Sequence, residues 1–209
     1  MGDSPVPPSS RHPLSVGGLR RALSPTLGGE SVDVPAGRRP AAVAAIFREG
    51  RDGAEVLLIR RAERVGDPWS GHMAFPGGRH EPSDRDLLRT AVRETAEEIG
   101  IDLESHASLV GILEDEDAAG LRRREPMPIR PFVFELHRPA EMRPNEEVTE
   151  VIWTPIGPLV RGERKSSIDV DYEKNRYTLP AYDVDGRIVW GLTYRMLQGL
   201  FDRLAGVAT

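Results

Sequence analysis

The segment from Gly77 to Ile101, GGRHEPSDRDLLRTAVRETAEEIGI, constrains the fold more than any other part of the chain. After a glycine pair and a short polar stretch, apolar residues recur at helical spacing until Gly100. This period predicts a helix whose buried face consists of Leu87, Leu88, Ala91, Val92, Thr95 and Ile99. We expect Ser83 or Asp84 to cap the N-terminus, because short polar side chains accept hydrogen bonds from the first backbone N–H groups. Gly100 suits the left-handed position that follows the last turn.

Three carboxylates, those of Glu94, Glu97 and Glu98, belong to one turn of this predicted helix. Residues three and four apart share a helix face, so these side chains lie close together and repel one another. Such a cluster requires a cation when it is directed at a pocket, and hard oxygen ligands are those that Mg²⁺ prefers. Arg93 is placed to orient or partly neutralise the cluster, and the preceding glycine pair offers backbone without a shielding Cβ. The alternative is a solvent-exposed charged face, which most surface helices carry.

Apolar runs on both sides of the helix predict strands. The pattern indicates strands at 41–47, 55–60, 72–75, 107–114, 129–136 and 147–153, a hairpin turn at Asp185-Gly186 and a last amphipathic helix over 190–204. The first two strands flank a turn at 51–53 and therefore predict a hairpin. Helices and strands do not alternate regularly, so we expect an α+β fold, an α/β/α sandwich in which a mixed sheet lies between helices.

The length of 209 residues suits one domain with a terminal extension. Residues 1–35 are predicted to form an N-terminal arm that is polar and proline-rich at first. Within this arm we expect a short helix over 15–28, which carries Leu19, Leu23 and Leu27. Residues 36–209 are predicted to form the folded domain.

Composition excludes several classes of site. The chain has no cysteine, which removes disulfides, thiolate nucleophiles, cysteine-ligated zinc and iron–sulfur clusters. A formal net charge of −5 argues against a general nucleic-acid binder. Residues 1–10 lack the apolar stretch of a signal peptide, and no apolar run is long enough to span a bilayer. We therefore expect a cytoplasmic protein that has neither nucleic acid nor a membrane as its partner.

The segment resembles the Nudix box of Nudix hydrolases, in which a glycine and then a glutamate precede Arg-Glu-x-x-Glu-Glu-x-Gly. Residues 93–101, RETAEEIGI, match the end of the box in full. The front is one residue longer than usual between Gly78 and Arg93. The first box glutamate therefore falls at Arg85 when residues are counted back from Arg93, and at Asp84 when they are counted forward from Gly78. We favour Asp84 as its substitute.

The lengthened box resembles that of the coenzyme A pyrophosphatase branch, which also carries an upstream signature ending in Phe-Pro-Gly-Gly. Arg61, Gly71 and Phe75 fit that signature. The Thr, Arg and His expected in it are absent, and the residues near their places are Ile59, Asp67 and Trp69. The resemblance covers most of residues 40–204 and implies a Nudix hydrolase domain. Its partner would be a nucleotide-containing small molecule: coenzyme A, ADP-ribose, a nucleotide sugar or a dinucleotide.

The resemblance also implies roles for individual residues. The implied ligands of Mg²⁺ or Mn²⁺ are Glu94, Glu97, Glu98 and the backbone carbonyl of Gly78 or Gly77. The implied catalytic residues are Glu94, Glu98, Arg93 and a loop glutamate outside the box, for which we choose Glu147 and keep Glu146 and Glu150 as alternatives. The candidate substrate-binding residues are Arg61, Arg79 and Trp69. Further candidates are Arg60 and Arg130 at phosphate, the acidic run 114–117 at the metal, and Tyr172, Tyr177 and Tyr182 at a base.

Two other functions occur on this fold. One is a nucleotide sensor that binds without cleaving, which is expected to have lost box carboxylates, whereas this chain keeps all three. The other is prenyl diphosphate isomerisation, which requires a catalytic cysteine that this chain does not have. Many relatives are homodimers, so a homodimer is an expectation by analogy.

Overall fold

The computed structural model describes residues 14–23, 40–66, 69–118, 127–172 and 174–207. Within them the main sheet has eight strands and follows the order β3-β2-β1-β7-β5, while β4 pairs with β1, β6 with β7 and β8 with β2. Its strands are β1 (Ala41–Gly50), β2 (Gly53–Arg61), β3 (Met73–Ala74), β4 (Gly77–Arg79), β5 (Ala107–Ile112), β6 (Glu116–Asp117), β7 (Pro128–Leu136) and β8 (Val148–Pro155). β1 and β7 run parallel and β1 and β2 antiparallel, so the sheet is mixed, as predicted.

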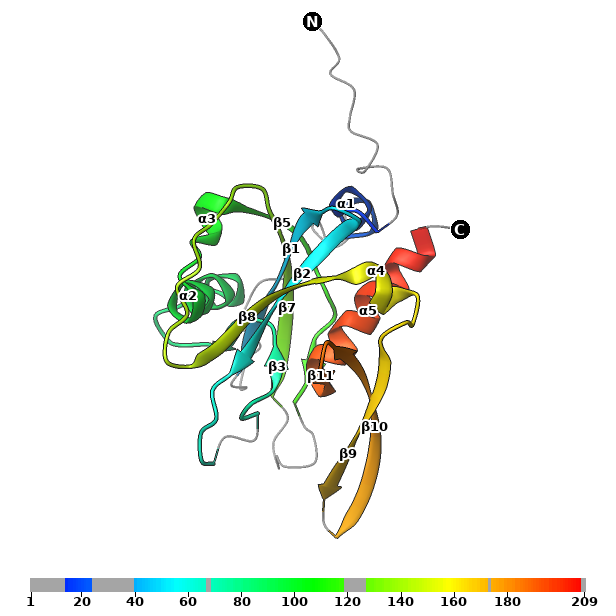
Figure 1. The fold of residues 1–209 in the computed structure, drawn as a ribbon. Helices are drawn as coiled ribbons and strands as arrows, with labels where there is room; N and C mark the ends of the chain where they lie inside the picture. Colours follow the sequence, from blue (N-terminus) through cyan, green and yellow to red (C-terminus); the bar gives the residue numbers. More distant parts are fainter. Residues whose placement is uncertain (1–13, 24–39, 67–68, 119–126, 173, 208–209) are drawn as a thin grey trace, which may run out of the picture.

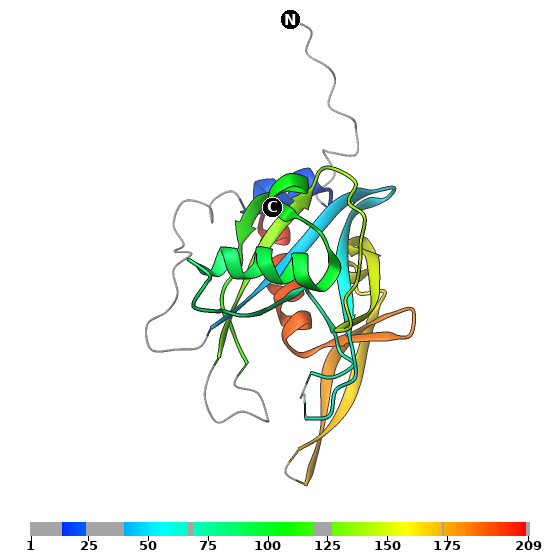
Figure 2. The ribbon, with the colours of Figure 1, turned by 90° about the vertical axis from the view of Figure 1, so that its left-hand side faces the viewer.

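Helices cover both faces of this sheet (Figure 1 and Figure 2). Strand β1 shows why, since its side chains alternate between two cores: Ala42, Ala44 and Ile46 face one side, and Ala45 and Phe47 face the other. The first side packs against α2 (Leu87–Ile99), with α3 (Leu103–His106) beside it. The second side packs against α1 (Val16–Leu23), α4 (Ile156–Val160) and α5 (Gly191–Val207). The predicted α+β sandwich is confirmed.

The short helix predicted over 15–28 is α1, which ends at Leu23. Its Leu19 and Leu23 are fully buried, and it packs beside α5 as part of the core. Leu27 and the glycines after it lie outside the described residues. Among the described residues, no helix is long and apolar enough to cross a membrane.

The structure has a second sheet, of which the sequence analysis predicted only the hairpin turn at Asp185-Gly186. Its strands are β9 (Lys165–Tyr172), β10 (Asn175–Val184) and β11 (Arg187–Trp190), in the order β11-β10-β9. The β9–β10 ribbon extends away from the main sheet (Figure 1). The predicted hairpin turn is confirmed, with positive φ at Asp185 and Gly186. The last helix starts at Gly191, because Trp190 is the last residue of β11 and pairs with Ala181 of β10.

The cap predicted for α2 is wrong by two or three residues. Asp86 is the N-cap, and its carboxylate accepts a hydrogen bond from Arg89 N at 2.8 Å. Ser83 and Asp84 precede the helix in a turn that is closed by the hydrogen bond from Asp84 N to Glu81 O. The predicted end is correct: Gly100 has φ 74°, and its N–H donates to Ala96 O.

Replacing Asp86 by alanine is expected to lower the free energy of unfolding by about 1 kcal/mol, because an N–H of the first turn loses its acceptor. Thermal or urea unfolding of the purified variant measures the change. Ser83→Ala is the control and should leave stability unaltered, since the contact of its hydroxyl with Glu81 is long, at 3.5 Å. Equal losses in both variants would contradict this assignment of the cap.

Candidate active site

The glycine pair lies between β1 and α2, where β4 pairs antiparallel with β1. Gly77 has φ 151°, and a Cβ there would stand 2.3 Å from Ala42 O and 2.6 Å from Val43 Cα. A Cβ on Gly78 would stand 2.3 Å from Oε1 of Glu94. Gly77 therefore permits the strand pairing, and Gly78 permits a carboxylate of α2 to approach the backbone.

Glu98 is the most deeply buried charged residue of this site, with 2% of its surface exposed. Its Oε2 accepts a hydrogen bond from Gly77 N at 2.8 Å, and its Oε1 lies 3.9 Å from Nη1 of Arg61. Burial raises the pKa of Glu98 to about 7, against the opposing effects of the Gly77 hydrogen bond and the Arg61 charge. The charges of Glu94 and Glu147 raise it further.

Glu94 lies one turn earlier on the same side of α2. Its Oε1 is 3.1 Å from Nη1 of Arg93. Burial raises the pKa of Glu94, Arg93 opposes the shift, and the charges of Glu97 and Glu147 add to it. Glu94, Glu98 and Glu147 thus repel one another electrostatically, as expected of carboxylates that share a site.

Glu97 shares Arg93 with Glu94. Its side chain is 55% exposed and pairs with Nη1 of Arg93 at 3.0 Å. Over the part of the chain that the structure describes, no three acidic or histidine side chains converge in a geometry that would hold a metal ion. The side chains of Glu94 and Glu98 are nevertheless a suitable donor set, because Mg²⁺ is commonly held by one or two carboxylates together with waters and substrate phosphate.

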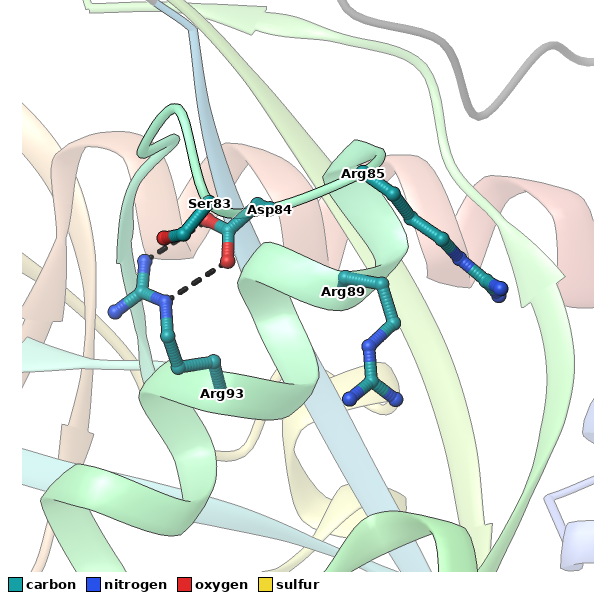
Figure 3. Close-up of a pocket in the computed structure, with 5 residues that line it drawn as sticks. All are labelled: Ser83, Asp84, Arg85, Arg89 and Arg93. Atoms are coloured by element: carbon teal, nitrogen blue, oxygen red, sulfur yellow. Dashed lines mark hydrogen bonds and ion pairs between the residues drawn. The ribbon is translucent and has the colours of Figure 1, made fainter.

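Arg93 is held by Asp84 through a bidentate ion pair, with Nε to Oδ1 at 2.9 Å and Nη2 to Oδ2 at 3.0 Å (Figure 3). The same guanidinium donates to the carbonyl of Arg79 at 3.1 Å. Burial disfavours the charge of Asp84, but the Arg93 hydrogen bonds and those from Glu81 and Thr90 outweigh it and lower the pKa to about 2. Arg85, the other counterpart of the first box glutamate, is 77% exposed and pairs with Asp86.

The turn before α2 leaves a pocket of about 300 Å³ that is lined by Ser83, Asp84, Arg85, Arg89 and Arg93. In Figure 3, Arg93 reaches toward Asp84, while Arg85 and Arg89 extend along the other side. Arg89 is engaged by Glu104 of α3. This pocket contains Asp84 and Arg93 but neither Glu94 nor Glu98, so it is not the site of the box glutamates.

Replacing Asp84 by asparagine is expected to reduce stability at neutral pH and to leave it nearly unchanged at pH 2. The pKa of Asp84 is lowered from 3.8 to about 2 in the folded chain, so its contribution is present above pH 4 and is lost as the pH falls through 2. The shift corresponds to about 2 kcal/mol. Urea unfolding at several pH values measures this. A deficit of equal size at pH 2 and pH 7 would contradict it.

The loop glutamates outside the box separate into three environments. The charge of Glu147 acts on Glu94 and Glu98, and its Oε1 accepts a hydrogen bond from Nη1 of Arg64 at 3.0 Å. The side chain of Glu146 is 89% exposed. Glu150 forms an ion pair with Arg187 of β11, so it is engaged away from the box carboxylates. Of the three, Glu147 is the one that the fold brings to the predicted site.

The predicted substrate-binding residues are only partly brought together. Arg61 lies at Glu98, whereas Trp69 is half-buried and packs against the core on the side of α1 and α5. Arg79 reaches the site through its carbonyl, and its side chain is exposed. Three of the further candidates have structural partners: Arg130 pairs with Asp115, Glu116 with Arg195, and Tyr182 is buried with its hydroxyl bonded to Gln198. Tyr177 is 39% exposed on β10.

Two residues of the site were missed in the sequence, Arg64 and Asn145. The side-chain oxygen of Asn145 accepts a hydrogen bond from Glu147 N at 2.8 Å. This bond to the backbone two residues further on is typical of asparagine in turns, so the Asn-Glu-Glu sequence before β8 was a usable signal. No local sequence pattern marked Arg64 as a site residue, apart from its position in the loop after β2.

Residues 37–170 match the NUDIX domain. The chain belongs to the Nudix family. Human mitochondrial coenzyme A diphosphatase NUDT8 is 34% identical over 142 residues, which are 66% of this chain and 58% of that protein. The fission yeast protein C14C4.10c is 40% identical over 119 residues, 56% of this chain and 36% of that protein. The chain therefore matches less than two thirds of the length of both relatives.

Other relatives cover more of the chain. The Nudix hydrolase NudL of Citrobacter koseri is 29% identical over 180 residues, which are 85% of this chain and 87% of that protein. Among solved structures, the Nudix hydrolase RenU of Mycobacterium smegmatis superposes with a TM-score of 0.52 at 18% identity, covering 82% of this chain and 86% of that one. This likeness supports the Nudix fold alone.

Proposed function

We propose that this Nudix protein hydrolyses a diphosphate bond in a nucleoside diphosphate linked to a second group, with Mg²⁺ or Mn²⁺ as its cofactor. One observation carries the proposal: the carboxylate of Glu98 is buried, hydrogen-bonded to Gly77 N and subject to the charges of Glu94 and Glu147. Carboxylates gathered in this way are unfavourable unless a cation joins them. A bound divalent ion supplies positive charge to phosphate oxygens and lowers the pKa of water.

The residues of the chain then have distinct tasks. Glu94 and Glu98 would hold the ion. Arg93 is held by Asp84 and orients the turn of α2 that carries both glutamates. Glu147 accepts the proton of the attacking water. The water oxygen forms a bond to one phosphorus, the bridging P–O bond breaks, and two phosphate monoesters leave. Positioning and charge supply most of the acceleration in reactions of this kind.

Coenzyme A is the first substrate to test. The lengthened box between Gly78 and Arg93 supports it, and so does the similarity to a human protein named as a coenzyme A diphosphatase. Hydrolysis would release 3′,5′-ADP and phosphopantetheine. Because the Thr, Arg and His of the upstream signature are absent, ADP-ribose and nucleotide sugars are the alternative substrates.

A nucleotide sensor that binds without cleaving is the second candidate, from a different class. Its recognition of a nucleotide would not require buried carboxylates. Retention of all three box glutamates, two of them directed at the glycine pair, favours hydrolysis.

The experiment is a substrate panel with either metal: coenzyme A, ADP-ribose, UDP-glucose, NADH, a diadenosine polyphosphate and an oxidised nucleoside triphosphate. Products are separated by chromatography, and Glu98→Gln is the control. Release of 3′,5′-ADP and phosphopantetheine that Glu98→Gln abolishes would assign coenzyme A. Cleavage of ADP-ribose or a nucleotide sugar instead would assign the alternative. Nucleotide binding without turnover of any compound would favour the sensor.

A further inference from the structure

The loop before β8 is fastened between α2 and the chain that leaves β2. Asn145 N donates to the carbonyl of Glu98 at 2.9 Å, and the Asn145 side chain accepts from Glu147 N. Glu147 O in turn accepts from Ala62 N at 2.7 Å. These bonds hold the backbone of Glu147 in place beside the box glutamates. Its carboxylate can therefore move only by rotation about the side-chain bonds.

Arg64 lies over this loop. Its Nη1 donates to Glu147 Oε1 at 3.0 Å, and its Nη2 lies 3.7 Å from Oε1 of Glu146. The backbone N–H of Arg64 donates to Ser70 Oγ at 2.8 Å, which ties the loop to the segment before β3. The Arg64 side chain is 46% exposed. An ion pair with this much solvent contact is weak, so another anion displaces it at little cost.

We propose that Arg64 binds the diphosphate of the substrate, exchanging Glu147 for phosphate oxygens when the substrate enters. In the free protein Arg64 neutralises Glu147, while Arg61 lies at Glu98 and Arg93 at Glu94. The exchange gives the guanidinium a bidentate anionic partner and leaves the Glu147 carboxylate unpaired beside the reacting water. This inference rests on the proposed function, since it names the residue that recognises the diphosphate.

Geometry and charge both support the exchange. Arg61 and Arg64 come from the same segment, and their partners Glu98 and Glu147 act on one another electrostatically, so Arg64 is one ion pair away from the buried carboxylates. Glu98 and Glu147 each have an arginine of their own, whereas Glu94 shares Arg93 with Asp84 and Glu97. A bound divalent ion would supply the neutralisation that Arg64 gives to Glu147. The planar guanidinium fork matches phosphate oxygens better than the ammonium of lysine does.

The test measures binding of α,β-methylene-ADP, which has no bridging oxygen to cleave, by calorimetry in the presence of Mg²⁺. Arg64→Ala is expected to weaken binding by about 10- to 100-fold, as for other charge-assisted hydrogen bonds to a ligand. Arg64→Lys should weaken it less. Arg143→Ala is the matched control from the same loop, where Arg143 pairs with the exposed Glu141, and should leave affinity unchanged. Mn²⁺ binding without nucleotide should not weaken in Arg64→Ala, and thermal melting confirms that each variant is folded.

The outcomes separate this inference from the proposed function. Wild-type affinity in Arg64→Ala, or an equal loss in Arg143→Ala, would overturn the role of Arg64 while hydrolysis of the panel could still stand. Weaker Mn²⁺ binding in Arg64→Ala would also overturn it, since Arg64 would then only position Glu147. Arg64-dependent binding of the analogue without turnover of any substrate would defeat hydrolysis and keep the diphosphate contact. A wild-type protein that does not bind the analogue would overturn both.

Discussion

Glu98→Gln is expected to lower kcat by about 10³-fold, because the loss of one carboxylate removes several kcal/mol of charge stabilisation at the metal. Glutamine keeps the shape of the side chain, and its carbonyl can still accept the hydrogen bond from Gly77 N. The variant should therefore remain folded. Steady-state kinetics over a range of Mg²⁺ and Mn²⁺ concentrations measures the effect and shows whether added metal restores turnover.

Two comparisons sharpen this result. Glu97→Gln alters the exposed member of the cluster and should cost less activity than Glu98→Gln, since Glu97 is directed at Arg93 and solvent. Glu141→Gln, whose side chain is 75% exposed and pairs with Arg143, is the control for the change of charge. Full activity in Glu98→Gln would remove Glu98 from the metal site and with it the basis of the proposed mechanism.

The same substitution has an opposite effect on the stability of the metal-free protein. Because burial raises the pKa of Glu98 from 4.5 to about 7, ionisation of Glu98 destabilises the folded chain as the pH rises through that window. At pH 8 in a chelator, Glu98→Gln should therefore be more stable than the wild type by up to about 3 kcal/mol. At pH 4 the two should be nearly equal. Urea unfolding at both pH values tests the sign.

Alanine at the two adjacent glycines is expected to give two different failures. Gly77→Ala should lower the free energy of unfolding by roughly 3 kcal/mol, because its Cβ meets backbone atoms of Ala42 and Val43 at a strained φ. Gly78→Ala should instead leave stability nearly unchanged and lower kcat by about 10²-fold, or close to 3 kcal/mol. The three atoms nearest to its Cβ all belong to the carboxylate of Glu94, which can rotate away and is then lost to the site.

Chemical unfolding and steady-state kinetics of both variants measure this division. Gly199→Ala is the control, since a Cβ on this exposed residue of α5 meets nothing within 4 Å. Alanine in a helix should stabilise it by about 0.5–1 kcal/mol. Equal losses of stability in Gly77→Ala and Gly78→Ala would show that the side chain of Glu94 cannot move, contrary to the argument.

Local pattern was sufficient for α2, for the β1–β2 hairpin and for the turn at Asp185-Gly186. In each case the signal lies within a few residues, as helical spacing, strand length or a turn dipeptide. The β9–β10 ribbon escaped prediction although Ile168, Val170 and Tyr172 alternate with more exposed residues in β9. None of the first six residues of β10 is buried, so the partner strand carries no such period. The cap of α2 was misplaced because Asp84 and Asp86 are chemically equal as caps, and only the pairing of Asp84 with Arg93 decides between them.

The sequence by itself determined that three glutamates follow a glycine pair on one helix, because spacing along a helix is a local property. Only the tertiary structure decided which of them are buried. The packing of α2 on β1 and β4 directs Glu98 at Gly77 and leaves Glu97 in solvent. Tertiary structure also brought Glu147 and Arg64 to the site, through hydrogen bonds between residues far apart in the chain. Such contacts depend on the pairing of β2 with β8, which brings the segment after β2 beside the loop before β8. No periodicity in the sequence encodes this pairing.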